Sequence, residues 1–96
     1  MNYSFHPLAE IELNEAIDYY NERQLDLGKE FNKEVYSTIQ TILAFPEAWF
    51  ALSKSTRRCL LYRFPYGIIY QILQNEILII AVMQLNKRSH YWKKRK

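Results

Sequence analysis

Basic side chains concentrate in the second half of this 96-residue chain, where they could contact or act on an anionic partner. Residues 49–96 carry ten basic residues and one acidic residue, a balance of +9, whereas residues 1–48 have nine acidic and three basic residues, a balance of −6. Cations in such numbers bind phosphates and stabilise the charge of a phosphorane during RNA cleavage. Six of them lie on or beside the predicted strands: Lys54, Arg57, Arg58, Arg63, Lys87 and Arg88.

The other groups that such chemistry needs are scarce. Cleavage of RNA by its 2′-OH requires a proton acceptor and a proton donor, and His90 is the only imidazole near these bases. No His, Cys or carboxylate cluster has the spacing of metal ligands, and two glycines, Gly28 and Gly67, cannot form a phosphate-binding loop. The sequence therefore predicts no metal and no cofactor, and the same bases could equally form a solvated rim or a binding surface.

Three runs rich in Ile, Leu, Val and Tyr position these bases, and they predict an antiparallel three-strand meander. The runs are Arg57–Phe64, Ile68–Gln74 and Ile77–Leu85, separated by two turn-forming breaks. In the last run, the residues that point to either face of the sheet are apolar, which places this run inside the sheet with both faces covered. In the first run, Arg58 and Arg57 point to opposite faces of the sheet, and the alternation of side chains alone does not say which face meets the helices. Cys59 in this run is expected to be a small buried hydrophobic side chain.

Two amphipathic segments precede the meander. Apolar positions at helical spacing predict one helix over 7–23 and a second over 27–45, joined by a short polar link as an antiparallel hairpin. Residues 2–6 can add an edge strand. The predicted fold is α+β, in the order β-α-α-β-β-β, with the N-terminal helix hairpin packed on a four-stranded antiparallel sheet and a basic C-terminal tail. Residues 1–96 are expected to form a single domain.

The loop and the tail around the meander carry aromatic residues. Trp49 and Phe50 are expected to plug one end of the core, because aromatic side chains bury large areas. The segment 87–92 directly follows a central strand, so its aromatics can pack back on the sheet, whereas 93–96 is expected to be a frayed, solvated end.

The remaining composition points to a soluble, cytoplasmic protein without a membrane partner. A single cysteine excludes an internal disulfide and suits a reducing compartment. No signal-peptide pattern is present at the N-terminus, and no apolar run approaches the roughly 20 residues that a bilayer requires.

The order of strand, helix hairpin, meander and basic tail resembles the RelE/ParE superfamily of toxins from type II toxin–antitoxin modules, over nearly the whole chain. Phe5-His6-Pro7-Leu8-Ala9-Glu10, with Leu13 and Tyr20, resembles the first strand and helix of the family. Arg57-Arg58 followed by Phe64-Pro65-Tyr66-Gly67-Ile68-Ile69-Tyr70 is similar to the "R-R…F-P-Y-x-I-x-Y" stretch of the ParE-like, plasmid-stabilisation branch. Ile79-Ile80-Ala81-Val82-Met83, then Lys87-Arg88 and Tyr91-Trp92, resemble the ending "I-x-A-V-x-H-x-x-R-x-P-x-Y-W".

The resemblance implies one of two activities, each neutralised by a cognate antitoxin. ParE-type members bind DNA gyrase and poison it, and RelE-type members cleave messenger RNA on the ribosome without metal. Gln84 stands where the family ending usually has His, and Ser89 stands where it has Pro. Because Gln does not titrate near neutral pH, this position cannot transfer protons. The resemblance therefore favours the ParE-like branch, with a RelE-like endoribonuclease as the alternative.

Each activity assigns roles to the same basic and aromatic residues. For target binding we expect an arginine-rich, aromatic surface, because these side chains commonly anchor protein interfaces: Arg57, Arg58, Arg63, Lys87, Arg88, Tyr91 and Trp92. For RNA cleavage the candidates are Arg57, Arg58, Lys87 and Tyr91, of which Tyr91 occupies a position similar to the C-terminal Tyr of RelE-type toxins. The expected target is DNA gyrase or the ribosome with its messenger RNA. A third hypothesis is a non-toxic nucleic-acid-binding domain, and it rests only on the net charge of +9 in residues 49–96.

Overall fold

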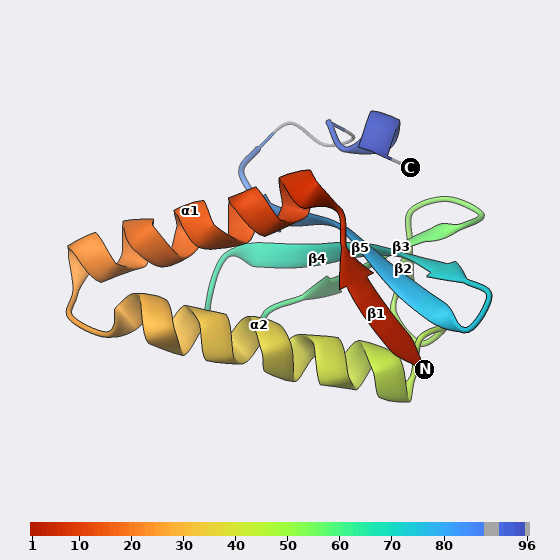
Figure 1. Ribbon diagram of the computed structural model, residues 1–96, viewed down its shortest axis with the longest axis horizontal. Coiled ribbons are helices and arrows are strands. Elements are labelled where there is room, and N and C mark those ends of the chain that lie inside the picture. The colour runs from red at the N-terminus through yellow and green to blue at the C-terminus, as the bar shows by residue number, and fades with distance from the viewer. Residues whose placement is uncertain (88–90, 96) are drawn as a thin grey trace.

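The computed structural model describes residues 1–87 and 91–95, which form a helix hairpin on one face of a five-stranded sheet (Figure 1). This confirms the α+β class and the packing of the hairpin on a sheet. The elements in chain order are β1 (Asn2–Phe5), α1 (Pro7–Arg23), α2 (Leu27–Ala44), β2 (Phe50–Ala51), β3 (Thr56–Leu60), β4 (Tyr66–Leu73), β5 (Glu76–Gln84) and the short 3-10 helix η1 (Lys93–Arg95).

The helices form where the apolar spacing predicts them. Pro7 opens α1, and the His6 imidazole caps it by accepting a hydrogen bond from Leu8 N at 3.1 Å. The apolar stripes of both helices face the sheet, and their fully buried members include Ala9 on α1 and Phe31 on α2. Phe45 departs from the prediction, since α2 ends at Ala44 and the Phe45 side chain is left 64% exposed.

Gly28 lets the two helices approach closely. A Cβ at this position would lie 2.2 Å from Ile17 O and 2.6 Å from Asn21 Cγ, and the Gly28 N–H donates to Asn21 Oδ1 at 2.8 Å. The backbone oxygen cannot yield as a flexible side chain can. We expect Gly28→Ala to lower the free energy of unfolding by about 3 kcal/mol, through overpacking. Urea unfolding measures this loss.

Gly67→Ala is the matched control for that substitution. A Cβ there would lie 3.3 Å from the Arg58 and Leu60 side chains, which can move. A loss at Gly28 no larger than the loss at Gly67, expected at about 1 kcal/mol or less, would contradict the close-approach account.

The sheet differs from the prediction in strand number and in one direction. Its order is β1-β5-β4-β3-β2, and β3, β4 and β5 form the predicted antiparallel meander. β1 pairs parallel to β5, not antiparallel, and the two-residue β2 adds a fifth strand beside β3. Apolar periodicity sets which side chains face the core but carries no information on strand direction, and two residues are too short for a period.

β5 has both faces covered, as its uniform apolarity predicts. Ile77, Ile79 and Val82 join the core under the helices, whereas Ile80 and Ala81 join a second apolar cluster on the opposite face. A register shift opposite Ile69/Tyr70 places Ile80 and Ala81 on the same side, as a β-bulge does. We refer to the face away from the helices as the outer face and to this second cluster as the outer cluster: Ile69, Ile80, Ala81, Met83 and Trp92.

The first strand of the meander is shorter than its apolar run. β3 ends at Leu60, and the chain then turns so that Leu61 and Phe64 both enter the core beneath the helices while Tyr62 is 96% exposed. The alternation predicted for Arg57–Phe64 therefore fails after Leu60. Trp49 packs against the core as expected, but Phe50 lies on β2 and is 64% exposed, so only one of the two aromatics plugs the core.

Candidate functional site

Arg58 lies on the outer face of β3. Its strand neighbour Cys59 is buried in the core under the helices, so Arg58 must point the other way. Its guanidinium carbon stands 5.2 Å from the centre of the Phe50 ring, a cation–π distance. Gly67 on β4 has no side chain, and the Arg58 stem lies over it. These neighbours orient the guanidinium without neutralising its charge.

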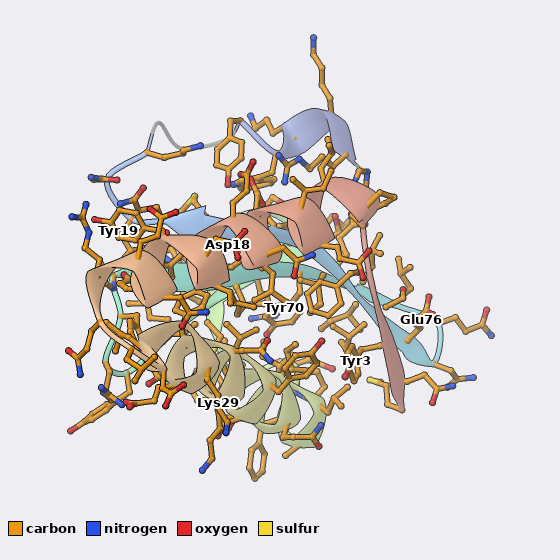
Figure 2. All side chains as sticks on the ribbon, turned by 60° about the vertical axis from the view of Figure 1, so that its left-hand side comes forward. Tyr3, Asp18, Tyr19, Lys29, Tyr70 and Glu76 are labelled. Carbon is orange, nitrogen blue, oxygen red and sulfur yellow. The ribbon has the colours of Figure 1, made fainter. Side chains whose placement is uncertain are left out.

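Arg57 faces the helices instead and holds a loop in place. Its Nη1 donates to Trp49 O at 2.8 Å, while the Tyr70 hydroxyl donates to Pro46 O at 2.7 Å. Together these bonds tie the segment after α2 to β3 and β4, and Figure 2 shows Tyr70 in the interior between the helices. Burial raises the pKa of Tyr70 to about 12. Arg57 is therefore part of the structural framework.

Arg63 also lies on the helix side, beyond the end of β3. Its Nη1 forms an ion pair with Glu30 Oε1 at 2.8 Å, with both side chains about half exposed. The Glu34 carboxylate accepts from the backbone N–H groups of Tyr62 and Arg63 at 2.5 and 2.8 Å. Two carboxylates of α2 thus anchor this loop, and an exposed pair of this kind contributes little to stability.

Tyr91 and Trp92 return to the sheet, as predicted. Trp92 is 2% exposed and belongs to the outer cluster, with Tyr91 packed beside it. Lys87 Nζ lies 5.6 Å from the centre of the Tyr91 ring. Burial, together with the nearby Glu12 carboxylate, raises the pKa of Tyr91 well above its ordinary value, so its phenol stays protonated at neutral pH. Arg88 and His90 lie outside the described residues.

Glu12 and Arg95 form a partly buried ion pair that sequence reasoning missed. Arg95 Nη1 and Nη2 donate to the two Glu12 carboxylate oxygens at 2.8 and 3.1 Å, and the side chains are 12% and 14% exposed. The expectation of a frayed end at 93–96 is therefore wrong for Lys93–Arg95, which forms η1 and is tied to α1. Neither residue stands out in the sequence, because Glu12 falls among other acids and Arg95 in a basic run.

The pocket beside Lys87 and Tyr91 is too small for a nucleotide. Its volume is about 50 Å³, little more than one or two water molecules require. Gln84 and Glu15 also line it. Arg57 and Arg58 do not line it, so the four candidates for RNA cleavage are not assembled around one cavity. Among residues 1–87 and 91–95, no group of three or more His, Cys, Asp or Glu side chains is placed to hold a metal ion.

Comparison with known proteins gives two findings. The model of the family described as "ParE toxin of type II toxin-antitoxin system, parDE" matches residues 3–90. The chain belongs to the ParE toxin family. A solved structure titled "Chromosomal ParDE TA system from P. aeruginosa" is similar in fold, with a TM-score of 0.76 and 15% identity, over 90% of this chain and 97% of that chain. No curated protein sequence matches.

In this ParE family member, the predicted target-binding residues divide between two faces. Arg58 and Trp92 lie on the outer face, whereas Arg57 and Arg63 lie on the helix side. Tyr91 packs against the outer cluster and, with Lys87, lines the pocket beside Glu12 and Glu15 of α1. The family match confirms the ParE-like resemblance that the sequence motifs indicate. In the described part of the chain, no helix is long and apolar enough to cross a membrane.

Proposed function

We propose that this ParE family member is the toxin of a type II toxin–antitoxin pair, that it arrests growth by binding and poisoning DNA gyrase, and that a cognate antitoxin neutralises it. The observation that carries the proposal is the family match over residues 3–90. The small pocket at Lys87 and Tyr91 favours surface recognition over RNA cleavage.

The proposed target-binding surface is the outer face around the C-terminal segment. Arg58 presents a guanidinium with no acidic partner among the described residues, and Lys87 and Tyr91 supply a second cation and an aromatic ring. Arginine and tyrosine are frequent anchors of protein interfaces, and the positive charge would steer association with an acidic partner.

Four assays test the proposed activity. Expression of the chain alone should stop growth, and co-expression of the adjacent small gene should restore it. Purified protein should inhibit supercoiling by gyrase, and mapping of messenger RNA ends after induction should show no new cleavage. New RNA ends without gyrase inhibition would replace this proposal with the RelE-like alternative. Salt-dependent DNA binding without either effect would favour a non-toxic nucleic-acid-binding domain.

The open edge of β3 is the proposed site for an extended antitoxin segment. β2 pairs only with Arg57 and Arg58, so β3 continues beyond β2 for two residues. Leu61 N bonds to Tyr66 O on the β4 side, which directs the main chain of Leu60 to the opposite, open edge. A cavity of about 370 Å³ lies along this edge, lined by Trp49, Phe50, Arg58, Cys59 and Leu60. An added strand would pair with the edge and place an apolar side chain in the cavity.

Leu60→Asp should therefore weaken antitoxin binding. Leu60 is 51% exposed, so the folded state tolerates the charge, whereas a carboxylate in the cavity would be desolvated when the partner binds. We expect at least a tenfold rise in the Kd for the antitoxin, measured by calorimetry. Leu73→Asp is the control, because Leu73 is 41% exposed on β4 and lies outside this cavity. Equal effects of the two variants would place the antitoxin elsewhere.

A further inference from the structure

Glu12 and Arg95 bind backbone groups of β5 in the stretch that extends beyond β1. β1 ends at Phe5, opposite Ile79, and the next backbone groups along β5 need other partners. Val82 N donates to Glu12 Oε1 at 3.0 Å, and Ile80 O accepts from Arg95 Nη1 at 3.2 Å. At the β-bulge, this side-chain pair therefore supplies hydrogen bonds to the β5 backbone that a neighbouring strand supplies elsewhere.

The geometry of the pair gives it one defined orientation. Both guanidinium nitrogens of Arg95 meet both oxygens of Glu12, and two-point contacts of this type fix direction as well as distance. Removing one partner would leave the other charge largely buried and unpaired. The contact therefore joins α1, β5 and η1 at a single point, at the place where Figure 1 shows the C-terminal segment beside the start of α1.

Tyr91 depends on this contact. The Arg95 guanidinium carbon lies 5.0 Å from the centre of the Tyr91 ring, and Lys87 Nζ lies 5.6 Å from it. Arg95 N also donates to Trp92 O at 3.0 Å, which closes the turn that begins at Trp92, next to Tyr91. Arg95 thus contacts the Tyr91 ring and fixes the turn that follows it, and Lys87 lies beside the same ring.

We propose that Glu12 and Arg95 are positioning residues for target binding. They clamp η1 to α1 and β5, and so hold Tyr91 and Lys87 in the arrangement that contacts the target. This inference rests on the proposed function, since it assigns a role within that binding surface. A preformed arrangement loses less conformational freedom on binding, so release of the clamp weakens binding without removing any contacting group.

The first test compares Arg95→Ala with Lys94→Ala. Both remove one positive charge from η1, but Lys94 is exposed and takes no part in the clamp. Arg95→Ala should raise the concentration needed for half-inhibition of gyrase supercoiling at least tenfold, and Lys94→Ala should change it less than threefold. Arg95→Lys keeps the charge but not the two-point contact, and should fall between them. A matching pair on α1 is Glu12→Gln against Glu22→Gln, because Glu22 is exposed and lies outside the pocket beside Lys87 and Tyr91.

A second measurement follows the clamp directly. Trp92 is 2% exposed, and its release should shift its fluorescence to the red and raise its quenching by acrylamide. In a Trp49→Phe background, Arg95→Ala should show both changes and Lys94→Ala neither, while the circular dichroism of the helices is retained.

The outcomes separate this inference from the proposed function. If the wild-type chain does not inhibit gyrase, the proposed function fails, and the fluorescence comparison alone decides whether the clamp holds the C-terminal segment. If the wild-type chain inhibits gyrase and Arg95→Ala inhibits equally well, the positioning role is overturned. A loss of activity in Arg95→Ala with unchanged Trp92 fluorescence would also overturn it, because Arg95 would then act by touching the target itself.

Discussion

Arg58→Ala should yield a folded protein that no longer arrests growth, whereas Arg57→Ala should weaken the fold. Arg58 stands on the outer face beside the Phe50 ring and has no ion pair among the described residues, so its loss chiefly removes a binding group. Loss of an arginine that acts as an interface hot spot costs about 2 kcal/mol or more, which corresponds to about a 30-fold loss of affinity. Arg57 instead donates a half-buried hydrogen bond to Trp49 O, and its loss should reduce stability by about 1–2 kcal/mol.

The two variants are compared by viable counts after induction, by gyrase inhibition, and by thermal unfolding. We expect Arg58→Ala to have a near wild-type Tm and to cause no growth arrest. We expect Arg57→Ala to have a lower Tm and still to arrest growth at a temperature where it is folded. Growth arrest by Arg58→Ala at the wild-type level would exclude the outer face as the working surface. Loss of toxicity in a folded Arg57→Ala protein would transfer that role to the helix side.

The fold should lose most of its stability between pH 10 and pH 12. Burial raises the pKa of Tyr66 and of Tyr70 from 10.0 to about 12, so the folded state keeps both phenols protonated where the unfolded chain ionises them. The stability that these groups contribute is complete below pH 10 and is lost as the pH rises towards 12. Two pKa units correspond to about 2.7 kcal/mol per tyrosine, and the two together rival the net stability of a small domain.

Urea unfolding at a series of pH values measures this loss. Tyr66→Phe removes one of the ionising groups and should make the fall between pH 10 and 12 smaller. Cys59, whose pKa burial raises from 9.0 to about 11, adds a decline of similar size that begins at lower pH, and Cys59→Ser should remove it. A free energy of unfolding that stays level from pH 10 to 12 would show that these phenols are hydrated in the folded protein.

Periodicity predicted the helices and the buried strand because burial acts on single residues. The apolar stripe of α1 and the apolar residues on both faces of β5 were predicted only from which side chains should be buried. The structure confirms that these side chains are buried. The direction of β1 and the existence of β2 depend on how the chain is routed in space, and that information lies in no single segment.

The candidate site was predicted less well, for a related reason. Alternation placed Arg57 and Arg58 on opposite faces, yet it could not say which face the helices cover, so both were assigned to one surface. Arg63 was assigned to the strand, and β3 ends before it. The clamp between Glu12 and Arg95 joins residues 83 positions apart, and pairing at that distance is visible only once the fold is known.

The place of β5 in the sheet also sets the order in which the protein can be completed during its synthesis. In the described part of the chain, β5 is the only strand neighbour of β1, which ends at Phe5, whereas β5 begins at Glu76. β1 therefore stays without a strand partner until β5 has been translated. A nascent chain interrupted before residue 76 has a helix hairpin without the strand that α1 packs on, and so no complete core. Any activity that depends on the folded sheet can therefore begin only after β5 has been translated.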